Sequence, residues 1–589
     1  MSRGAVLVVP ACGKGMGGGH MIRCMALVRG LRALGRDAWL FLPAAADRNC
    51  IIETMGFEKN WLVAETGLQG KLLSCIVLDR FQTPQEELAR WMDIAPVIGI
   101  DEGGPSRDCF DFLIDILPGL SKSRANISDP SLLPLPEKKE QPAPQHENPP
   151  LKILVSFGQE DAAGLGPQAA HAIAAKNSDS IKITLLRGGS EAIHNLNEHL
   201  NDYDLVITHY GLTAFESLYA GVPVLLVSPT KYHKKLAQAA GFRSPGTGKG
   251  GAAKIAGLLL KNGEPNLPFL ENLKKRCAAL AAKYNLDHPP RQSLAELIDS
   301  FAPDASRSCP ACGSKKVTVT LARFPERTYR RCPGCGAISM NRLTPPPIAY
   351  GREYFFEQYH KQYGTTYIED FPNLIAMGKR RLSVIKSLLP AEGGAEPLLL
   401  DIGCAYGAFL AAAKEEGFSP YGIDPAEDAV RHITDTLGLT AAQGFFPPLP
   451  EAALPASRYD VITLWYVIEH FRGCLPALAE IRKLLKPGGV LAFATPSFSG
   501  ISGRVSLRNF LQRSPADHWT IWSPAACKKA LKAAGFTVHK IVITGHHPER
   551  FPLLGKYAQS SKSPLYRLLL ALSTIFALGD TFEVYAVSD

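Results

Sequence analysis

A chain of 589 residues, of which 46% are hydrophobic, is long enough for about four domains with their own cores. Its formal charge of +9 is mild for this length and its basic residues are dispersed, which argues against a nucleic-acid-binding stripe. Residues 1–10 hold too short an apolar run for a signal peptide, and the apolar run 568–578 is too short to span a bilayer. The thirteen cysteines suit reduced thiols, so we expect a cytoplasmic protein.

The first predicted strand, 5–9, leads into a glycine-rich loop at the start of a helix. This loop contains Gly17, Gly18 and Gly19 and is followed directly by His20. It suits a phosphate or pyrophosphate, but the pattern Gly-x-x-x-x-Gly-Lys-[Ser/Thr] of an ATP-binding loop is absent. A helix N-terminus disfavours an imidazolium, so His20 is a candidate neutral base; the alternative is a histidine that caps or packs.

The run Gly-Gly-His-x-x-Arg-Cys at 18–24 resembles the UDP-sugar hydrolases of pseudaminic acid biosynthesis and the related spore-coat polysaccharide glycosyltransferases. These proteins share the two-lobed GT-B fold. The resemblance therefore implies one lobe over 1–128 and a nucleotide-binding lobe over 151–300. It also implies that His20 activates water or a sugar hydroxyl, with release of UDP. Between the lobes, 129–150 contains seven prolines and is predicted to be a linker or hinge.

A second motif similar to that family is Asp-Leu-Val-Ile-Thr-His-Tyr-Gly-Leu-Thr-Ala-Phe-Glu, which ends at Glu216. By the resemblance, Glu216 binds the ribose and the backbone at Gly211 and Thr213 faces the diphosphate. The chain departs from the family at Tyr232-His233, where the family has Asn-Gln in contact with substrate. We therefore expect nucleotide binding to persist while the sugar preference, or catalysis itself, differs.

Two Cys-x-x-Cys pairs, each followed by glycine, are separated by nineteen residues in the middle of the chain. This spacing is typical of a zinc ribbon, here over 305–345, in which four thiolates fill a tetrahedral shell and leave no position for catalysis. Two redox pairs or metal-free turns are the alternatives. The ligands of this structural Zn²⁺ would be Cys309, Cys312, Cys332 and Cys335.

An apolar strand at 398–402 runs into Asp-x-Gly-x-x-x-Gly, and a second apolar strand ends at Asp424. The glycines let the backbone approach a cofactor, the next helix offers amides to a carboxylate, and Asp424 can accept both hydroxyls of a ribose. An NAD site is the rival interpretation, and the downstream residues decide against it. The candidate cofactor-binding residues are Asp401, Gly403, Ala405, Gly407 and Asp424.

From Tyr459 the chain continues with a fourth strand, the turn Lys-Pro-Gly-Gly and a fifth strand. This series resembles the class I S-adenosylmethionine-dependent methyltransferases and implies such a domain over 346–589. Aromatic residues at 350–363 resemble the segment that joins a ribbon to the core in sugar and small-molecule enzymes; a helix packing its rings into the core is the alternative. The acid or amide that often reads adenine is missing after the third strand, where Gln443 is the substitute.

The loop after the fourth strand would face the transferable methyl group. Its candidates are Tyr466, Glu469 and His470, with His470 as base and Glu469 orienting it, unless this pair caps a helix or bonds the cofactor. Some quinone O-methyltransferases bind a metal through Glu-x-x-Glu-His, but Tyr466 replaces the first acid, so we expect no metal there. His518-Trp519 would close the acceptor pocket or pack in the core. Asn-Pro-Pro-Tyr and Pro-Cys, which serve nucleobase methylation, are absent.

These patterns predict an α/β protein with two Rossmann-like GT-B lobes, a zinc ribbon and a Rossmann-like class I methyltransferase domain. The expected function is bifunctional glycan biosynthesis: methyl transfer from S-adenosylmethionine to a sugar or nucleotide sugar, fused to a UDP-sugar hydrolase or glycosyltransferase. One alternative is a methyltransferase with a non-catalytic nucleotide-sugar-binding module, and another is a zinc-ribbon RNA methyltransferase. A UDP-sugar or other glycan acceptor is the expected partner, nucleic acid is not, and the oligomeric state stays open.

Overall fold

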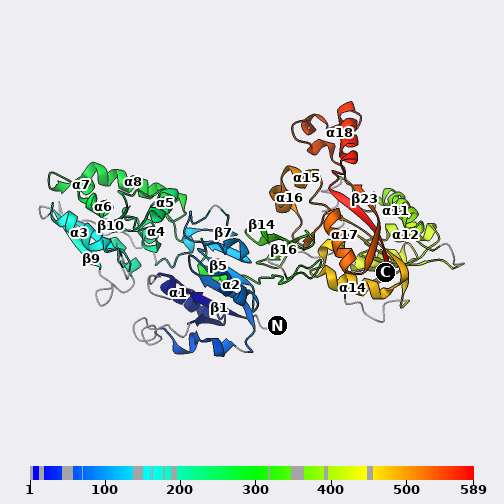
Figure 1. Ribbon diagram of the computed structural model, residues 1–589, viewed down its shortest axis with the longest axis horizontal. Helices are drawn as coiled ribbons and strands as arrows, with labels where there is room; N and C mark the ends of the chain where they lie inside the picture. The colour runs from blue at the N-terminus through cyan, green and yellow to red at the C-terminus, as the bar shows by residue number, and fades with distance from the viewer. Residues whose placement is uncertain are drawn as a thin grey trace. The chain divides into compact units, whose positions relative to one another are not determined.

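The computed structural model of the chain folds into two compact units (Figure 1). The first unit contains residues 1–304 and 323–327, and the second contains 305–322 and 328–589. Gly17, Gly18 and the aromatic segment 350–363 lie outside the described residues. The described residues are 4–11, 19–42, 57–68, 70–121, 123–136, 150–158, 161, 163–176, 180–186, 196–315, 319–346, 364–390, 395–447 and 456–589.

The first lobe of the first unit is a wholly parallel seven-stranded sheet in the order β3-β2-β1-β4-β5-β6-β7. Its central strands are runs of buried aliphatic residues, as expected for a sheet covered on both faces. The strand order reverses between β1 and β4, the position at which open sheets of this kind bind ligands. The elements are β1 Ala5–Pro10, α1 Gly19–Ala33, β2 Ala38–Phe41, β3 Leu62–Val63, β4 Leu73–Asp79, α2 Gln85–Met92, β5 Val97–Ile100, β6 Phe112–Asp115 and β7 Ile127–Ser128.

The second lobe has a smaller parallel sheet in the order β11-β10-β8-β9, which reverses between β8 and β10. Helix α9 returns to pack on α1 of the first lobe, where a Cβ on Gly30 would lie 2.6 Å from Cβ of Ala295. The elements are β8 Leu151–Ser156, α3 Leu165–Ala174, β9 Ile181–Leu186, β10 Leu205–Thr208, α4 Leu212–Tyr219, β11 Val224–Leu226, α5 Lys231–Ala239, α6 Gly248–Ala253, α7 Ile255–Leu259, β12 Leu260–Lys261, β13 Glu264–Pro265, α8 Leu267–Lys283 and α9 Leu294–Asp299. These sheets agree with the predicted α/β class; that they are GT-B lobes stays a prediction.

The first residues of the predicted linker at 129–150 are folded. Asp129 accepts a hydrogen bond from the amide of Ser131 and caps a short 3-10 turn, Pro130–Leu132. Leu132 and Leu133 are buried. The apolar side chains therefore hold the first residues of this proline-rich stretch against the lobe, which proline content alone did not predict.

The second unit begins with a four-stranded sheet in the order β14-β15-β16-β22. Strand β16 pairs antiparallel with β22, which comes from much later in the chain, with Ile338 opposite Ile521. The tip of the β14–β15 hairpin, 323–327, belongs to the first unit. The strands are β14 Val319–Phe324, β15 Arg327–Arg331, β16 Ile338–Arg342 and β22 Thr520–Ile521.

The main sheet of the second unit has the order β19-β18-β17-β20-β21-β24-β23, with β24 antiparallel to both of its neighbours. Alternate residues of its strands enter two separate apolar clusters, as the two faces of one sheet require. The strands are β17 Leu398–Ile402, β18 Ser419–Asp424, β19 Thr440–Gln443, β20 Tyr459–Trp465, β21 Leu485–Pro496, β23 Phe536–Thr544 and β24 Thr581–Ser588. The helices are α11 Phe371–Lys386, α12 Ala408–Glu415, α13 Glu427–Asp435, α14 Cys474–Leu484, α15 Ile501–Val505, α16 Leu507–Arg513, α17 Pro524–Ala533 and α18 Pro564–Ile575.

One of these clusters also contains residues of the cysteine region, among them Cys309, Cys335 and Ala337. The cysteine turns therefore share a hydrophobic core with the main sheet. Among the residues that the structure describes, no helix combines the length and apolarity needed to cross a bilayer.

Candidate functional site

The turn between β17 and α12 depends on glycines in the left-handed backbone region. Gly403 has φ 73° and Gly407 has φ 84°. A Cβ would lie 2.4 Å from Cγ2 of Val467 at the first position and 2.7 Å from Cγ1 of Ile433 at the second. Ala405 lies between them with φ 47°. The first turn of α12 has no side-chain cap, which suits a helix N-terminus that receives a ligand carboxylate.

Two buried carboxylates lie near the ends of β17 and β18. The two oxygens of Asp424 each accept one backbone amide, from Ala405 at 2.8 Å and Ala426 at 2.9 Å. Because an ionised carboxylate offers about four acceptor positions, it retains capacity for two ribose hydroxyls. Burial raises the pKa of Asp424. Burial also raises the pKa of Asp401 to about 7, and its Oδ1 accepts a hydrogen bond from Thr463 that joins β17 to β20.

The predicted cofactor residues thus lie where the order of the main sheet reverses, between β17 and β20. Gln443, at the end of β19, donates its amide to the carbonyl of Pro425 at 3.1 Å. It therefore lies beside the strand end that carries Asp424. The residues present fit a nucleoside cofactor with a carboxylate at one end and a ribose at the other.

His470 lies in a short 3-10 helix, Ile468–His470, after β20. Its Nδ1 is 2.7 Å from Oδ2 of Asp517, in the loop before β22. Burial opposes protonation, but the hydrogen bond to Asp517 and the neighbouring carboxylates raise the pKa of His470 above its ordinary value. A carboxylate on Nδ1 fixes the tautomer in which Nε2 accepts a proton. Asp517 therefore has the orienting position that the sequence suggested for Glu469.

Glu469 is buried next to this histidine. Its Oε2 accepts a hydrogen bond from Thr495 at 3.1 Å. Its Oε1 is buried and has no hydrogen-bond partner within the described part of the chain. Burial raises the pKa of Glu469 to about 7. A carboxylate oxygen without a partner in a buried position is a feature of functional sites rather than of packing.

His518 joins the pair, and its ring packs edge-on against His470 with the centroids 4.7 Å apart. One ligand atom from each of Glu469, His470 and His518 lies within 4.8 Å of the others, close enough to share a metal ion. The expectation of no metal here rested on Tyr466 and did not include His518. Tyr466 itself has φ 62°, a strained conformation for a non-glycine residue, and burial raises the pKa of its phenol.

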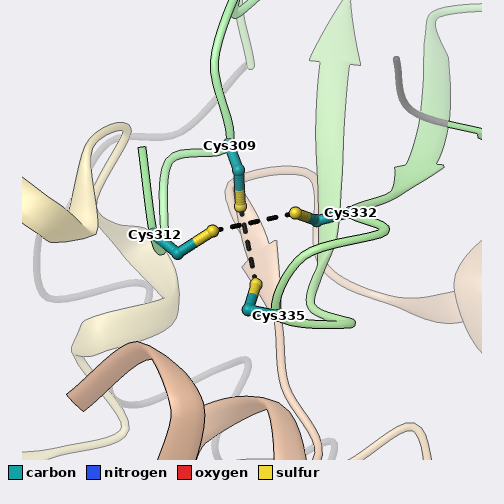
Figure 2. Close-up of side chains that lie close together, drawn as sticks. All are labelled: Cys309, Cys312, Cys332 and Cys335. Atoms are coloured by element: carbon teal, nitrogen blue, oxygen red, sulfur yellow. Dashed lines mark hydrogen bonds between the residues drawn. The ribbon is translucent and has the colours of Figure 1, made fainter. Parts of the chain in front are cut away.

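The four predicted zinc ligands converge on one point (Figure 2). The Sγ atoms of Cys309 and Cys335 are 3.7 Å apart, as are those of Cys312 and Cys332. Four thiolates around one zinc ion, each at about 2.3 Å, lie about 3.8 Å from one another. This separation excludes a disulfide of about 2.05 Å in the structure described and fits a tetrahedral ion.

The two cysteine turns have the same backbone design. The amide of Gly313 donates to the carbonyl of Cys309 at 2.8 Å, and the amide of Gly336 donates to that of Cys332 at 2.9 Å. Both glycines have positive φ, 70° and 87°, as the sequence predicted from the residue after each pair.

The strand after the second turn supports the loop that carries Asp517. The amide of Met340 donates to the carbonyl of Trp519 at 3.0 Å, and the guanidinium of Arg342 donates to the carbonyl of Ala516 at 2.8 Å. One backbone and one side-chain hydrogen bond therefore connect the strand after the cysteine cluster to the loop that carries Asp517. A sequence motif cannot reveal this link because β16 and β22 are far apart in the chain.

In the first unit, His20 lies at the start of α1 and is buried. Its Nδ1 is 2.7 Å from Oδ1 of Asp79, the last residue of β4. Arg23 donates to both oxygens of Asp79, at 2.5 and 2.7 Å, and to Asp101 at 2.6 Å. Although burial opposes it, Arg23 and His20 hold the pKa of Asp79 below its ordinary range. This histidine–aspartate pair lies where the first sheet reverses its order, between β1 and β4.

The second predicted nucleotide-binding motif, which ends at Glu216, lies close to Gly19, the last glycine of the glycine-rich loop. A Cβ on Gly19 would lie 3.1 Å from Cδ1 of Leu212, so the N-terminus of α1 approaches that of α4. Gly211 precedes α4, which has no side-chain cap, and Thr213 lies in its first turn. Burial raises the pKa of Glu216 to about 7, against a hydrogen bond from Thr213.

Two histidines lie beside this turn. His209 stacks on Phe157, and its Nδ1 is buried without a hydrogen-bond partner among the described residues. Burial lowers the pKa of His209 to about 4. His233 places Nδ1 2.8 Å from Oγ1 of Thr230, the residue that caps α5, while Tyr232 is half exposed. The sequence had marked Tyr232-His233 but not His209, whose only signal was its position inside the motif.

An open α/β sheet with a glycine turn after its first strand and an acid after its second defines a domain that binds a nucleoside cofactor. Residues 376–541 match the family model of a methyltransferase domain. The C-terminal region is thus a class I S-adenosylmethionine-dependent methyltransferase domain.

Curated proteins that are similar to the chain include two ubiquinone O-methyltransferases and a tRNA carboxymethyltransferase. The ubiquinone biosynthesis O-methyltransferase of Histophilus somni (strain 2336) is 32% identical over 136 residues, covering 21% of this chain and 55% of that protein. The one from Vibrio parahaemolyticus serotype O3:K6 (strain RIMD 2210633) is 29% identical over 189 residues, covering 30% and 78%. A tRNA U34 carboxymethyltransferase of Tolumonas auensis (strain DSM 9187 / NBRC 110442 / TA 4) is 31% identical over 142 residues, covering 23% and 44%. The chain thus spans about half the length of the first of these relatives.

Proposed function

We propose that the second unit transfers a methyl group from S-adenosylmethionine to a hydroxyl or amine of a sugar or nucleotide sugar. The observation that carries this proposal is the His470–Asp517 pair beside the orphaned carboxylate oxygen of Glu469. A hydroxyl or amine acceptor must lose a proton as it attacks, and a histidine oriented by a carboxylate is suited to take it.

S-adenosylmethionine supplies an electrophilic methyl group on a sulfonium. The amides that open α12 would hold its carboxylate, and Asp424 would accept its ribose hydroxyls. His470 would take the acceptor proton at Nε2 while Asp517 holds Nδ1–H. Tyr466, held at the end of β20, would shape the pocket between donor and acceptor. Orientation of the acceptor for in-line attack then contributes to the rate together with proton removal.

The cysteine cluster would hold a structural zinc ion. All four ligands are thiolates, so no coordination position remains for substrate. The ion would stabilise the hairpin whose strand β16 pairs with β22. A cation shared by Glu469, His470 and His518 is a second candidate for the acceptor site, favoured by the 4.8 Å grouping of their ligand atoms. It would bind the acceptor oxygen and lower its pKa in place of a general base.

For the first unit, the proposal is a UDP-sugar site with His20 as base. Water or a sugar hydroxyl would form the new bond to the anomeric carbon, the bond from that carbon to the diphosphate oxygen would break, and UDP would leave with the electron pair. His20 would take the proton of the attacking group, with Asp79 holding Nδ1–H. The approach of Gly19 to Leu212 supports a nucleotide held between α1 and α4. The alternative is a module that binds the nucleotide sugar without reacting with it.

Calorimetric titration with S-adenosylmethionine and with UDP tests both sites before the acceptor is known. We expect both to bind, with the first lost in Asp424→Ala and the second in Glu216→Ala. Methylation of UDP-sugars that persists while His20→Ala abolishes UDP release would favour catalysis in both units. Unchanged UDP release in His20→Ala would favour the binding module. Tight RNA binding with a steep salt dependence would instead favour the RNA methyltransferase alternative.

A further inference from the structure

The segment between β23 and β24 exposes many large apolar side chains. It contains two 3-10 turns, Pro548–Arg550 and Gly555–Tyr557, and the helix α18. In Figure 1, α18 lies beyond the end of β23, away from the main sheet of its unit. Side chains that are at least half exposed are Leu553, Leu554, Tyr557, Leu568, Ile575 and Phe576. Exposed apolar side chains that are concentrated in one segment indicate an interaction surface.

Helix α18 is apolar on two sides and buries only one of them. Leu569 and Ser573 are its buried residues. Leu568 and Ile575, seven positions apart and therefore on one face, are 56% and 73% exposed. A helix that is apolar all round normally lies inside a core. Among the residues that the structure describes, none covers the outer face of α18, where Leu568 and Ile575 stay exposed.

The backbone holds one of these side chains outward at a conformational cost. Leu553 has φ 63°, in the region that favours glycine and asparagine, and its side chain is 86% exposed. Leu553 is not packed against the rest of the unit, and leucine does not favour this backbone conformation. A side chain that is kept despite strain and exposure is best explained by a partner outside the chain.

The charge of the apolar part of this segment, which excludes the ion-paired residues Glu549, Arg550 and Asp580 at its ends, favours an anionic partner. Residues 551–579 include Lys556, Lys562 and Arg567 and contain no aspartate or glutamate. All three basic residues are exposed. A second copy of the chain docked through the same surface would bring these cations together in a symmetric interface, which opposes self-association. An anionic lipid surface satisfies both the apolar and the basic groups.

The geometry also fits a lipid surface. Helix α18 has 12 residues and is therefore about 18 Å long, short of the roughly 30 Å of a bilayer core. It can lie along the interface with its apolar face among the acyl chains, while lysine and arginine reach the headgroups.

We propose that residues 551–579 form a docking surface for anionic membranes, which holds the second unit at a lipid bilayer. Leu553, Tyr557, Leu568 and Ile575 would enter the interface, and Lys556, Lys562 and Arg567 would bind lipid phosphates. The surface belongs to the β23–β24 segment and does not depend on the acceptor or on the first unit.

The test is co-sedimentation of the full chain with vesicles of phosphatidylcholine alone and with about one third phosphatidylglycerol. We expect binding to the anionic vesicles only, weakened by salt. Each basic residue near such a surface strengthens binding about fivefold, so the triple variant Lys556→Glu, Lys562→Glu, Arg567→Glu should lose at least about a hundredfold. Leu568→Glu with Ile575→Glu should lose at least about tenfold.

Leu267→Glu is the matched control, because Leu267 is a 64% exposed leucine on a helix of the first unit. It should bind vesicles like the unaltered chain. Calorimetric binding of S-adenosylmethionine, compared with the unaltered chain, shows that each variant is folded. Equal binding to neutral and anionic vesicles, or no loss in the folded variants, overturns the proposal. Loss of a dimer in these variants without any vesicle binding also overturns it and assigns the surface to self-association.

Discussion

Nδ1 of His470 lies 2.7 Å from the carboxylate of Asp517, a residue that the loop before β22 brings from outside the motif containing the histidine. If this carboxylate orients the base, Asp517→Asn should lower kcat for methyl transfer by at least about tenfold, which is part of the roughly 10²- to 10⁴-fold contribution of general-base catalysis. His470→Gln should lower kcat by about the full 10²- to 10⁴-fold. The KM for S-adenosylmethionine should change little in either variant.

The pH dependence of the rate distinguishes an orienting role of Asp517 from a purely structural one. Because Asp517 raises the pKa of His470, the asparagine variant should shift the acidic limb of the rate profile to lower pH. A variant with reduced activity but an unshifted profile would contradict the orienting role.

Elemental analysis should find about one zinc ion per chain in protein purified without chelator. Cys332→Ser should lose it, and His518→Ala should retain it. Since β16 joins the cysteine cluster to the loop of Asp517, the cysteine variant should also reduce methyl transfer. If a second ion is found and is lost only in His518→Ala, a cation binds at Glu469, His470 and His518. The general-base mechanism would then be abandoned.

The buried carboxyl of Glu469 should make stability depend on pH. Its pKa is about 7 in the folded chain and about 4.3 when unfolded. Between these values the folded state binds a proton that the unfolded state lacks, so the free energy of unfolding falls as pH rises through this window. Glu469→Gln should remove this contribution, on the order of 2–3 kcal/mol between pH 4.5 and 7.5.

Thermal unfolding of both chains across that pH range is the measurement. Subtracting the two curves cancels the shared contributions of Asp401 and Glu216, whose pKa values burial also raises. Parallel curves for the two chains would show that folding does not raise the pKa of Glu469.

Binding of S-adenosylmethionine should weaken on acidification at a higher pH than for an ordinary aspartate. Burial raises the pKa of Asp424, and only the ionised carboxylate accepts both ribose hydroxyls. Calorimetry over a descending pH series should show this loss in the unaltered chain. Asp424→Asn should bind about 10-fold or more weakly and without that pH dependence, since each hydrogen bond to a charged group contributes about 1.5–3 kcal/mol.

Asp79→Asn should abolish UDP release from a UDP-sugar substrate while UDP itself still binds. The asparagine keeps the size of the side chain but loses the charge that pairs with His20 and Arg23. Because breaking a buried ion pair also costs about 3–5 kcal/mol, the variant must first be shown to be folded by its unfolding curve. Arg32→Gln, which removes the ion pair to Asp37 and a hydrogen bond to the carbonyl of Ala38 at the other end of α1, is the control.

The sequence predicted most of what is local. A short motif predicted the glycine turn at Gly403 and Gly407, which lies beside Asp424 in the structure. The spacing of the four cysteines likewise predicted the cluster that they form. The methyltransferase class is confirmed for the C-terminal region. The roles of the individual site residues, the GT-B assignment and the acceptor stay predictions.

Pairings between distant segments could not be predicted. Asp517 and His470 come together because the segment before β22 lies against the turn after β20, where the amide of Trp519 donates to the carbonyl of Glu469 at 2.8 Å. Asp79 reaches His20 because β4 lies beside β1. A sequence motif gives the order of residues along the chain but not which strand ends become neighbours. The partly folded start of the predicted linker has the same origin, because burial of Leu132 depends on the shape of the lobe.

The antiparallel pairing of β16 with β22 has a consequence for modularity. A protein cut at residue 346, the boundary that the motifs suggest, would leave the hydrogen-bonding edge of β22 open and the Asp517 loop without its support. Recombination that exchanged the cysteine hairpin for another would therefore also alter the loop that carries Asp517. The cysteine hairpin from residue 305 onward and the methyltransferase domain are therefore expected to be inherited together.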